Sequence, residues 1–161
     1  MRSWVSASEE ETLAVGAALA EELRPDGTLL LSGELGSGKT VLARGVAGAL
    51  GVPPRAVVSP TFTLIAEHQG EGGRFVHVDL YRLEPGELSR LGLEELLAGE
   101  GVKVVEWAER LPFEVRGAIS LELSRQPGGG RRIEEVAVPA SPRQAAPRNP
   151  FQRDQRREDL P

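Results

Sequence analysis

The chain contains eight consecutive residues whose types and spacing suit the binding of a polyphosphate: Gly33-Glu34-Leu35-Gly36-Ser37-Gly38-Lys39-Thr40. They match the pattern G-x-x-x-x-G-K-[ST] at every fixed position. The apolar run 28–32 precedes them and the helix-like run 41–50 follows, so we expect the loop to join a strand to a helix. In such a loop the backbone N–H groups and the helix N-terminus attract phosphate. Lys39 is then expected to reach the β- and γ-phosphates, and the Thr40 hydroxyl to ligate Mg²⁺.

Two acidic residues, Asp79 and Glu106, are candidates for the remaining chemistry, because each directly follows an apolar run, 75–78 and 102–105. Magnesium in nucleotide sites usually takes one or two carboxylates from the ends of neighbouring strands. We assign Glu106 to the metal, directly or through water. Asp79 is assigned to the attacking water or to a second contact with the metal. For either acid alone, a solvated strand end is the alternative interpretation.

The segment 59–62, Ser-Pro-Thr-Phe, lies between the loop helix and the strand that ends at Asp79. A switch segment that senses the γ-phosphate would occupy this position. Its proline limits the local backbone, and the Thr61 hydroxyl could reach phosphate or metal. The alternative interpretation is an ordinary strand start.

Four further residues stand near these candidates without forming a motif of their own. His68 and His77 lack any metal-like spacing, and we interpret both as hydrogen-bonded structural residues. Tyr81 and Trp107 each lie beside a candidate acid. Core packing accounts for both aromatics, although an aromatic next to a site can also shape a partner surface.

Hydrophobic spacing and turn residues predict the elements that position these groups. Ser8 and Glu11 form a capping box that starts a helix over 9–23. Further helices are predicted over 39–50 and within 85–98, and strands over 28–32, 57–65, 75–79, 102–106, 118–124 and 133–138. The second and third strands, and the last two, are predicted to pair as hairpins. The result is an α/β fold like that of P-loop NTPases: a mainly parallel sheet flanked by helices, with an antiparallel hairpin portion.

Length and composition predict one domain over 1–138, followed by a disordered tail rich in proline and arginine over 139–161. Because the chain has no cysteines, disulfides, thiolate metal sites and cysteine nucleophiles are excluded. A net charge of −5 argues against the chain holding nucleic acid by itself. The sequence shows neither a signal peptide nor an apolar run of about 20 residues, so we expect a cytoplasmic protein without membrane contact.

Taken together, the motifs resemble those of the bacterial ATPase family of tRNA threonylcarbamoyladenosine biosynthesis, the TsaE family. Five motifs carry the resemblance, in the family's order: the loop 33–40, Arg44-Gly45, Ser-Pro-Thr-Phe at 59–62, His-x-Asp-x-Tyr-Arg at 77–82, and Glu106-Trp107. The similarity runs from about residue 8 to 133 and leaves out the tail.

The resemblance implies a small nucleotide-binding protein that hydrolyses ATP weakly on its own. It would act on a complex of the threonylcarbamoyl transferase subunit and its inactive paralogue, which modify adenosine 37 of tRNAs reading codons that begin with A. The tRNA would be contacted only through that complex. The family's site residues correspond here to Thr40 and Glu106 for Mg²⁺, residues 34–39 for the phosphates, Ser8 or Glu9 near the N-terminus, and Arg131 or Arg132 late in the fold.

The residues leave two other classes of function open, a small-molecule kinase and a nucleotide-gated binding module, and they argue against a GTPase. A small-molecule kinase of P-loop type would need an acceptor pocket and an arginine-rich lid, and neither is visible before the tail. A GTPase usually reads guanine with Asn-Lys-x-Asp, whereas the only asparagine, Asn149, lies in the tail. A nucleotide-gated binding module, with incidental hydrolysis, overlaps the favoured function.

Overall fold

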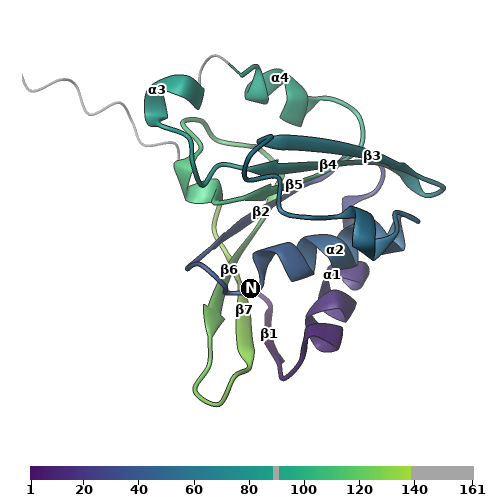
Figure 1. Ribbon diagram of the computed structural model, residues 1–161, viewed down its shortest axis with the longest axis vertical. Helices are drawn as coiled ribbons and strands as arrows, with labels where there is room; N and C mark the ends of the chain where they lie inside the picture. Colours follow the sequence, from purple (N-terminus) through teal and green to yellow (C-terminus); the bar gives the residue numbers. More distant parts are fainter. Residues whose placement is uncertain (89–90, 139–161) are drawn as a thin grey trace, which may run out of the picture.

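The structure is a computed structural model that describes residues 1–88 and 91–138 (Figure 1). In this described part the strands form one seven-stranded sheet in the order β1-β7-β6-β2-β5-β4-β3. The central strands β6, β2, β5 and β4 run parallel to one another, and β1, β7 and β3 are antiparallel to their neighbours. The strands are β1 (Ser3–Ser6), β2 (Thr28–Gly33), β3 (Ile65–Gly70), β4 (Gly73–Asp79), β5 (Val102–Glu106), β6 (Ile119–Arg125) and β7 (Arg131–Val136).

Helices cover both faces of this sheet, with α1 and α2 on one side and α3 and α4 on the other (Figure 1). They are α1 (Glu9–Leu23), α2 (Lys39–Ala49), α3 (Pro85–Leu88) and α4 (Leu93–Ala98), together with the 3-10 turns η1 (Pro54–Ala56) and η2 (Ala108–Arg110). This arrangement confirms the predicted α/β fold with its mainly parallel sheet and antiparallel hairpins.

Most predicted elements are confirmed to within two residues. Helix α1 has the predicted bounds, and Ser8 caps it, since Glu11 N donates to Ser8 Oγ at 3.2 Å. The second bond of the predicted capping box is shifted by one residue, because the Glu11 carboxylate accepts from Ala7 N at 2.6 Å rather than from Ser8 N. Strand β1 was not predicted. The predicted tail, 139–161, lies outside the described residues.

The predicted strand over 57–65 is wrong, because β3 begins only at Ile65. Pro60 cannot donate to a strand ladder, and its carbonyl instead accepts from Leu64 N at 2.6 Å in a turn. Leu64 itself has a φ of 67°, which no regular strand contains. The hairpin is therefore formed by β3 and β4, with Ile65 opposite Val78, and residues 57–64 form a loop that returns to the sheet edge.

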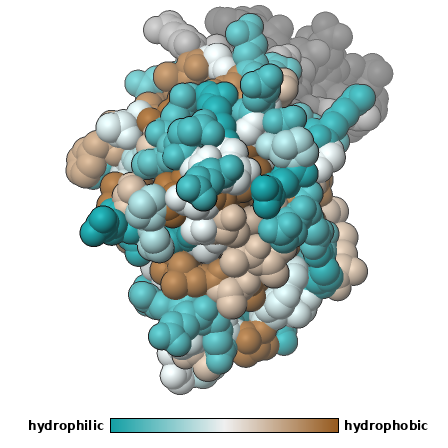
Figure 2. Space-filling view, turned by 90° about the vertical axis from the view of Figure 1, so that its right-hand side faces the viewer, coloured by the Kyte–Doolittle hydropathy of each residue, from teal (hydrophilic) through white to brown (hydrophobic). Residues whose placement is uncertain are grey.

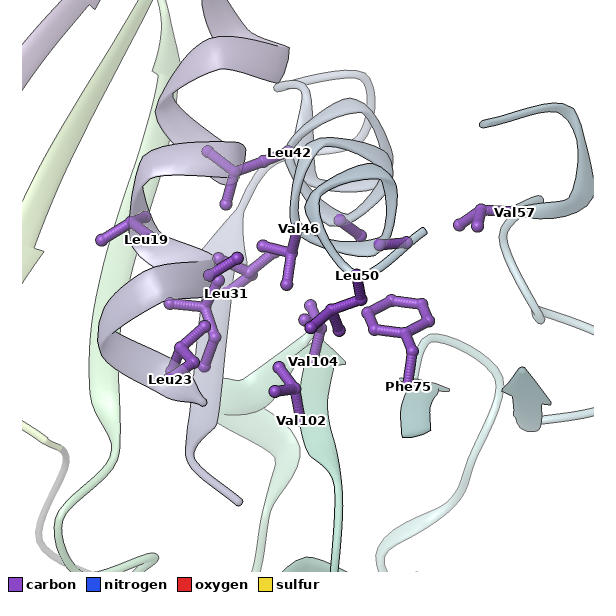
Figure 3. Packing of buried hydrophobic residues seen from close by; sticks show 14 of the residues in the cluster. Leu19, Leu23, Leu31, Leu42, Val46, Leu50, Val57, Phe75, Val102 and Val104 are labelled. Carbon is purple, nitrogen blue, oxygen red and sulfur yellow. The ribbon is translucent and has the colours of Figure 1, made fainter. Parts of the chain in front are cut away.

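Two apolar cores lie on the two faces of the sheet. The core beneath α1 and α2 joins Leu19, Leu42 and Val46 to Leu31 and Phe75 of the sheet (Figure 3). The other core packs Leu93 and Leu97 of α4 against the opposite face. Burying a side chain of this size stabilises the fold by roughly 1.5–3 kcal/mol. The loop that leads into α2 is thus fixed at both ends by buried elements.

The surface seen in Figure 2 is covered mostly by polar side chains, with apolar side chains in smaller groups between them. Among residues 1–88 and 91–138, no helix has the length and apolar character needed to cross a bilayer.

Two glycines bring α1 and α2 into close contact. A Cβ on Gly16 would lie 2.3 Å from Leu42 O of α2, and a Cβ on Gly45 would lie 2.2 Å from Leu13 O of α1. Since each contact is with backbone, neither can be relieved by a side-chain rotation. The pair therefore sets the distance between the two helices, and with it the position of the loop before α2.

We expect Gly45→Ala to lower the free energy of unfolding by about 1–3 kcal/mol, because its methyl group would force the two helices apart. The matched control is Gly48→Ala in the same helix, where an added Cβ meets nothing within 4 Å. That substitution should raise the free energy of unfolding by about 0.5–1 kcal/mol through helix propensity alone. Urea denaturation measures both, and equal effects of the two substitutions would contradict the packing argument.

Candidate active site

A cavity of about 470 Å³ opens at the carboxyl ends of the parallel strands, beside the loop that leads into α2. Its size falls in the range of roughly 300–1,000 Å³ typical of small-molecule sites. Of the predicted site residues, those that line it are Ser8, Glu9, Leu35, Gly36, Ser37, Gly38, Lys39, Thr40, Thr61, Asp79, Glu106 and Arg131, whereas Arg132 does not. Glu34 does not line the cavity. The structure thus brings together residues that are up to 123 positions apart in the sequence, from Ser8 to Arg131.

The loop 33–40 follows β2 and enters α2 directly, as predicted. Gly38 occupies the N-cap of α2 with a φ of 104°, a left-handed conformation that favours glycine. The guanidinium of Arg125, at the end of β6, supports the loop from outside by donating to Leu35 O at 3.2 Å and Gly36 O at 3.3 Å. The backbone N–H groups at the start of α2 are therefore available to an anion in the cavity.

Lys39 is only 4% exposed and its ammonium group is held within the loop. Nζ donates to Gly33 O at 2.6 Å and Glu34 O at 2.8 Å, and it lies 4.2 Å from the centre of the Trp107 ring. Burial lowers the pKa of Lys39, and the negative charge of Glu106 is the largest opposing effect. The carbonyls, the ring and the nearby carboxylate together favour the charged ammonium at the mouth of the loop.

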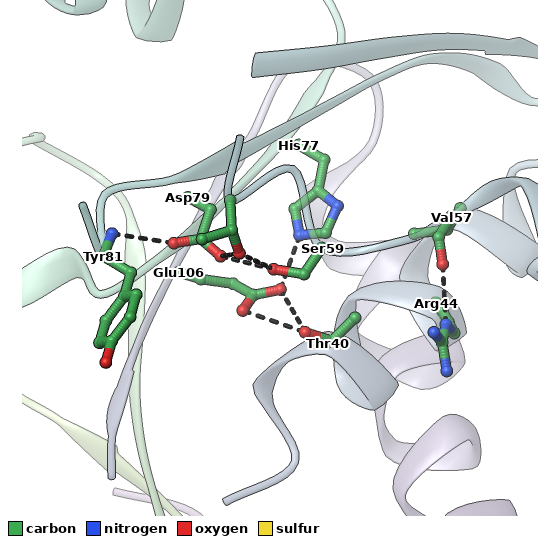
Figure 4. Close-up of polar contacts among 9 residues, drawn as sticks. Thr40, Arg44, Val57, Ser59, His77, Asp79, Tyr81 and Glu106 are labelled. Atoms are coloured by element: carbon green, nitrogen blue, oxygen red, sulfur yellow. Dashed lines mark hydrogen bonds and ion pairs between the residues drawn. The ribbon is translucent and has the colours of Figure 1, made fainter. Parts of the chain in front are cut away.

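Thr40 and Glu106 both line the cavity, and their side chains are in direct contact (Figure 4). The Thr40 hydroxyl is 2.9 Å from Glu106 Oε1 and 3.1 Å from Oε2. Glu106 Oε1 also accepts from His77 Nε2 at 2.7 Å. The two residues predicted to hold Mg²⁺ are 66 positions apart in the sequence. In the structure their hydroxyl and carboxylate groups are hydrogen-bonded to each other.

Asp79 lies opposite Glu106 in the β4–β5 register, and hydrogen bonds engage both of its carboxylate oxygens. Ser59 Oγ donates to Oδ2 at 2.5 Å and Thr61 Oγ1 at 3.1 Å, while Tyr81 N donates to Oδ1 at 2.9 Å (Figure 4). Asp79 thereby anchors the 59–62 segment at the cavity wall. Phe62 next to it is 81% exposed, under the guanidinium of Arg82 at 4.3 Å.

The donor set fits a magnesium nucleotide. Mg²⁺ prefers oxygen ligands and binds through one or two carboxylates together with substrate phosphates and water. The Thr40 hydroxyl and the Glu106 carboxylate supply such oxygens, beside an ammonium group and a helix N-terminus suited to phosphate. Within the described residues, no group of three or more His, Cys, Asp and Glu side chains forms a metal cage of its own.

Sequence reasoning missed three residues of this site region. Ser6 and Thr12 line the cavity and share a hydrogen bond of 2.7 Å, but Ser6 belongs to the unpredicted β1. Arg125 could have been found, because the carboxyl end of a strand parallel to β2 must lie beside the loop. Trp107 packs against the apolar core, as interpreted from the sequence, and it also lines the cavity, where its ring is tilted by 40° against that of Tyr81 at a centre distance of 4.8 Å.

We expect Asp79→Asn to loosen the 59–64 segment, because the amide nitrogen cannot accept from a hydroxyl. Hydrogen bonds to a charged acceptor are worth about 1.5–3 kcal/mol, so amide hydrogen exchange over 59–64 should quicken about tenfold or more. Glu67→Gln on neighbouring β3 is the control, since that carboxylate pairs with Arg74 at the surface. Unchanged exchange over 59–64 in the Asp79 variant would show that the segment is held by other contacts.

Comparison with known proteins gives consistent results. The family model described as threonylcarbamoyl adenosine biosynthesis protein TsaE matches residues 6–133, which include every residue of the cavity. A tRNA threonylcarbamoyladenosine biosynthesis protein TsaE from Bacillus subtilis is 43% identical over 139 residues, covering 84% of this chain and 85% of that protein. The protein of the same name from a Nostoc species is 39% identical over 132 residues, covering 80% of this chain and 81% of that protein. The crystal structure of YdiB from Bacillus subtilis has a TM-score of 0.69 at 34% identity, covering 86% of each chain.

Proposed function

We propose, because the chain belongs to the TsaE family of threonylcarbamoyl adenosine biosynthesis proteins, that it binds ATP with Mg²⁺ and hydrolyses it weakly in support of that tRNA modification. The observation that carries the ATPase part is the contact of Thr40 with Glu106, next to a phosphate-binding loop with its lysine in place. Residues 1–138 are proposed to form this ATPase domain.

The proposed roles follow from the contacts. The loop N–H groups and the Lys39 ammonium bind the β- and γ-phosphates, while Thr40 and Glu106 hold Mg²⁺. When bound, the metal neutralises charge on the phosphate oxygens. Asp79, directly or through Thr61, orients the attacking water, since their hydrogen bond places both at the cavity wall.

The rest of the cavity suits the nucleoside. Glu9 lies at the start of α1 and Arg131 at the start of β7, a strand that β6 and β2 separate from β5 and β4, which carry Glu106 and Asp79. The Arg131 side chain packs over the loop, with its Cγ 3.7 Å from where a Gly38 Cβ would lie. We assign these two residues to the adenosine end of ATP.

The exposed apolar side chains beside the cavity support a partner surface there. Leu35, Val58 and Phe62 are 67%, 61% and 81% exposed. We propose that the threonylcarbamoyl transferase subunit and its inactive paralogue bind this side of the molecule and stimulate hydrolysis in the cytoplasm. The net charge of −5 favours contact with tRNA through that complex, at adenosine 37 of tRNAs reading codons that begin with A.

Phosphate release from ATP and from GTP, with and without the transferase pair, tests the proposal. We expect slow turnover alone, a preference for ATP, and stimulation by the pair. Transfer of phosphate to a metabolite would instead indicate a kinase. Turnover that is equal with and without the pair would remove the basis for a partner-stimulated ATPase.

Two substitutions separate binding from hydrolysis. Lys39→Ala should weaken ATP binding by about tenfold to a hundredfold, since it removes charged hydrogen bonds to phosphate worth about 1.5–3 kcal/mol. Glu106→Ala should chiefly abolish hydrolysis and reduce the dependence of binding on Mg²⁺. Glu95→Ala, which removes an exposed acid of α4 that does not line the cavity, is the control and should change neither. Normal hydrolysis by Glu106→Ala would show that another group holds the metal.

A further inference from the structure

His77 is a fully buried imidazole in β4 that makes one polar contact with the candidate site. It is 0% exposed, and its Nε2 lies 2.7 Å from Glu106 Oε1 (Figure 4). Since the carboxylate oxygen accepts, Nε2 carries the proton and donates. Among the described residues, Nδ1 has no hydrogen-bond partner, so within that part of the chain the bond to Glu106 is the only hydrogen bond of the ring. The ring also packs against Phe75, with ring centres 5.9 Å apart.

The strand register makes this contact specific. In the parallel pair β4 and β5, His77 lies opposite Val104, and Glu106 lies opposite Asp79. The Glu106 side chain therefore reaches back by two register positions along β4, from the level of Asp79 to that of His77, to meet the imidazole. A glutamate has three side-chain torsions, so without such a restraint its carboxylate would take several orientations at the strand end.

The two oxygens of Glu106 are engaged unequally. Oε1 accepts the 2.7 Å bond from His77 and the 2.9 Å bond from Thr40. Oε2 has only the longer contact with Thr40, at 3.1 Å. Because Glu106 lines the cavity, the less engaged oxygen keeps lone pairs for a cation or for water bound to it.

We infer that His77 is a positioning residue: its Nε2–H fixes one oxygen of Glu106, so that the carboxylate meets Thr40 in a single orientation suited to Mg²⁺. The inference rests on the proposed magnesium site at Thr40 and Glu106. Hydrogen-bond partners of metal-binding groups commonly contribute tenfold to a hundredfold in metal affinity. A purely structural histidine would stabilise the fold and leave magnesium binding unchanged.

The test is calorimetric titration of the full chain with ADP at a series of Mg²⁺ concentrations, which gives the Mg²⁺ concentration needed for half of the gain in ADP affinity. His77→Leu removes the donor and should raise this concentration about tenfold or more, with little change in ADP binding in EDTA. His77→Gln can place an amide N–H near the position of Nε2 and should restore most of the Mg²⁺ response. His77→Asn places its amide nearer the position of Nδ1 and should behave like His77→Leu.

Phe75→Leu is the matched control, because it alters a buried ring two positions earlier on the same face of β4. It should lower the unfolding temperature without changing the Mg²⁺ requirement. A normal requirement in both His77→Leu and His77→Asn, or a shift in Phe75→Leu as large as theirs, would overturn the inference. Failure of the wild-type chain to bind ADP in the presence of Mg²⁺ would instead contradict the proposed function.

The protonation of the His77 ring in the wild-type chain can be measured even if the His77 variants do not fold. Nitrogen-15 NMR of the imidazole should show the proton of His77 on Nε2, with a resonance that shifts in Glu106→Gln and on addition of ADP with Mg²⁺. A proton on Nδ1 would rule out the positioning role. So would a resonance that shifts neither in Glu106→Gln nor on addition of ADP with Mg²⁺.

Discussion

The hydrogen bond between Thr40 and Glu106 joins the two halves of the site, and the rest of the structure is arranged so that it can form. Thr40 belongs to the first turn of α2, whereas Glu106 ends β5, and β5 pairs directly with β2, the strand before the loop. Because β2 and β5 are parallel, their carboxyl ends meet at one edge, which is where ligands bind in open α/β sheets. The same rule brings Asp79 beside Glu106 from β4.

The helix packing beneath the loop is equally restrictive. Gly16 and Gly45 let the backbones of α1 and α2 approach within a distance that any side chain would prevent. This contact fixes the axis of α2, and therefore the direction in which its first N–H groups and Thr40 point. It also carries the start of α1, with Glu9, to the cavity. A packing constraint outside the phosphate loop thus shapes both ends of the proposed nucleotide site.

Local signals in the sequence predicted the elements that depend on local energetics. The residues of the capping box predicted the start of α1, and apolar runs between turns predicted β2 and β5. Strand β1 has four residues and exists through its pairing with β7, about 130 positions away, so no local pattern marks it. The strand predicted over 57–65 does not form because Pro60 and the hydroxyl bonds from Ser59 and Thr61 to Asp79 favour a turn. Likewise, the His77 contact depends on a register that spacing alone does not reveal.

The charges of the site explain why metal and polyphosphate are expected to bind together. Lys39 and the start of α2 attract phosphate, but Glu106 and Asp79, both nearly buried, repel it. Two like unit charges 4 Å apart at an effective dielectric constant of 20 repel by roughly 4 kcal/mol. A divalent cation between carboxylate and phosphate reverses the sign of that term. The loop alone is suited only to phosphate, and the proposed selectivity for a magnesium nucleotide rests on the acid that β5 places against Thr40.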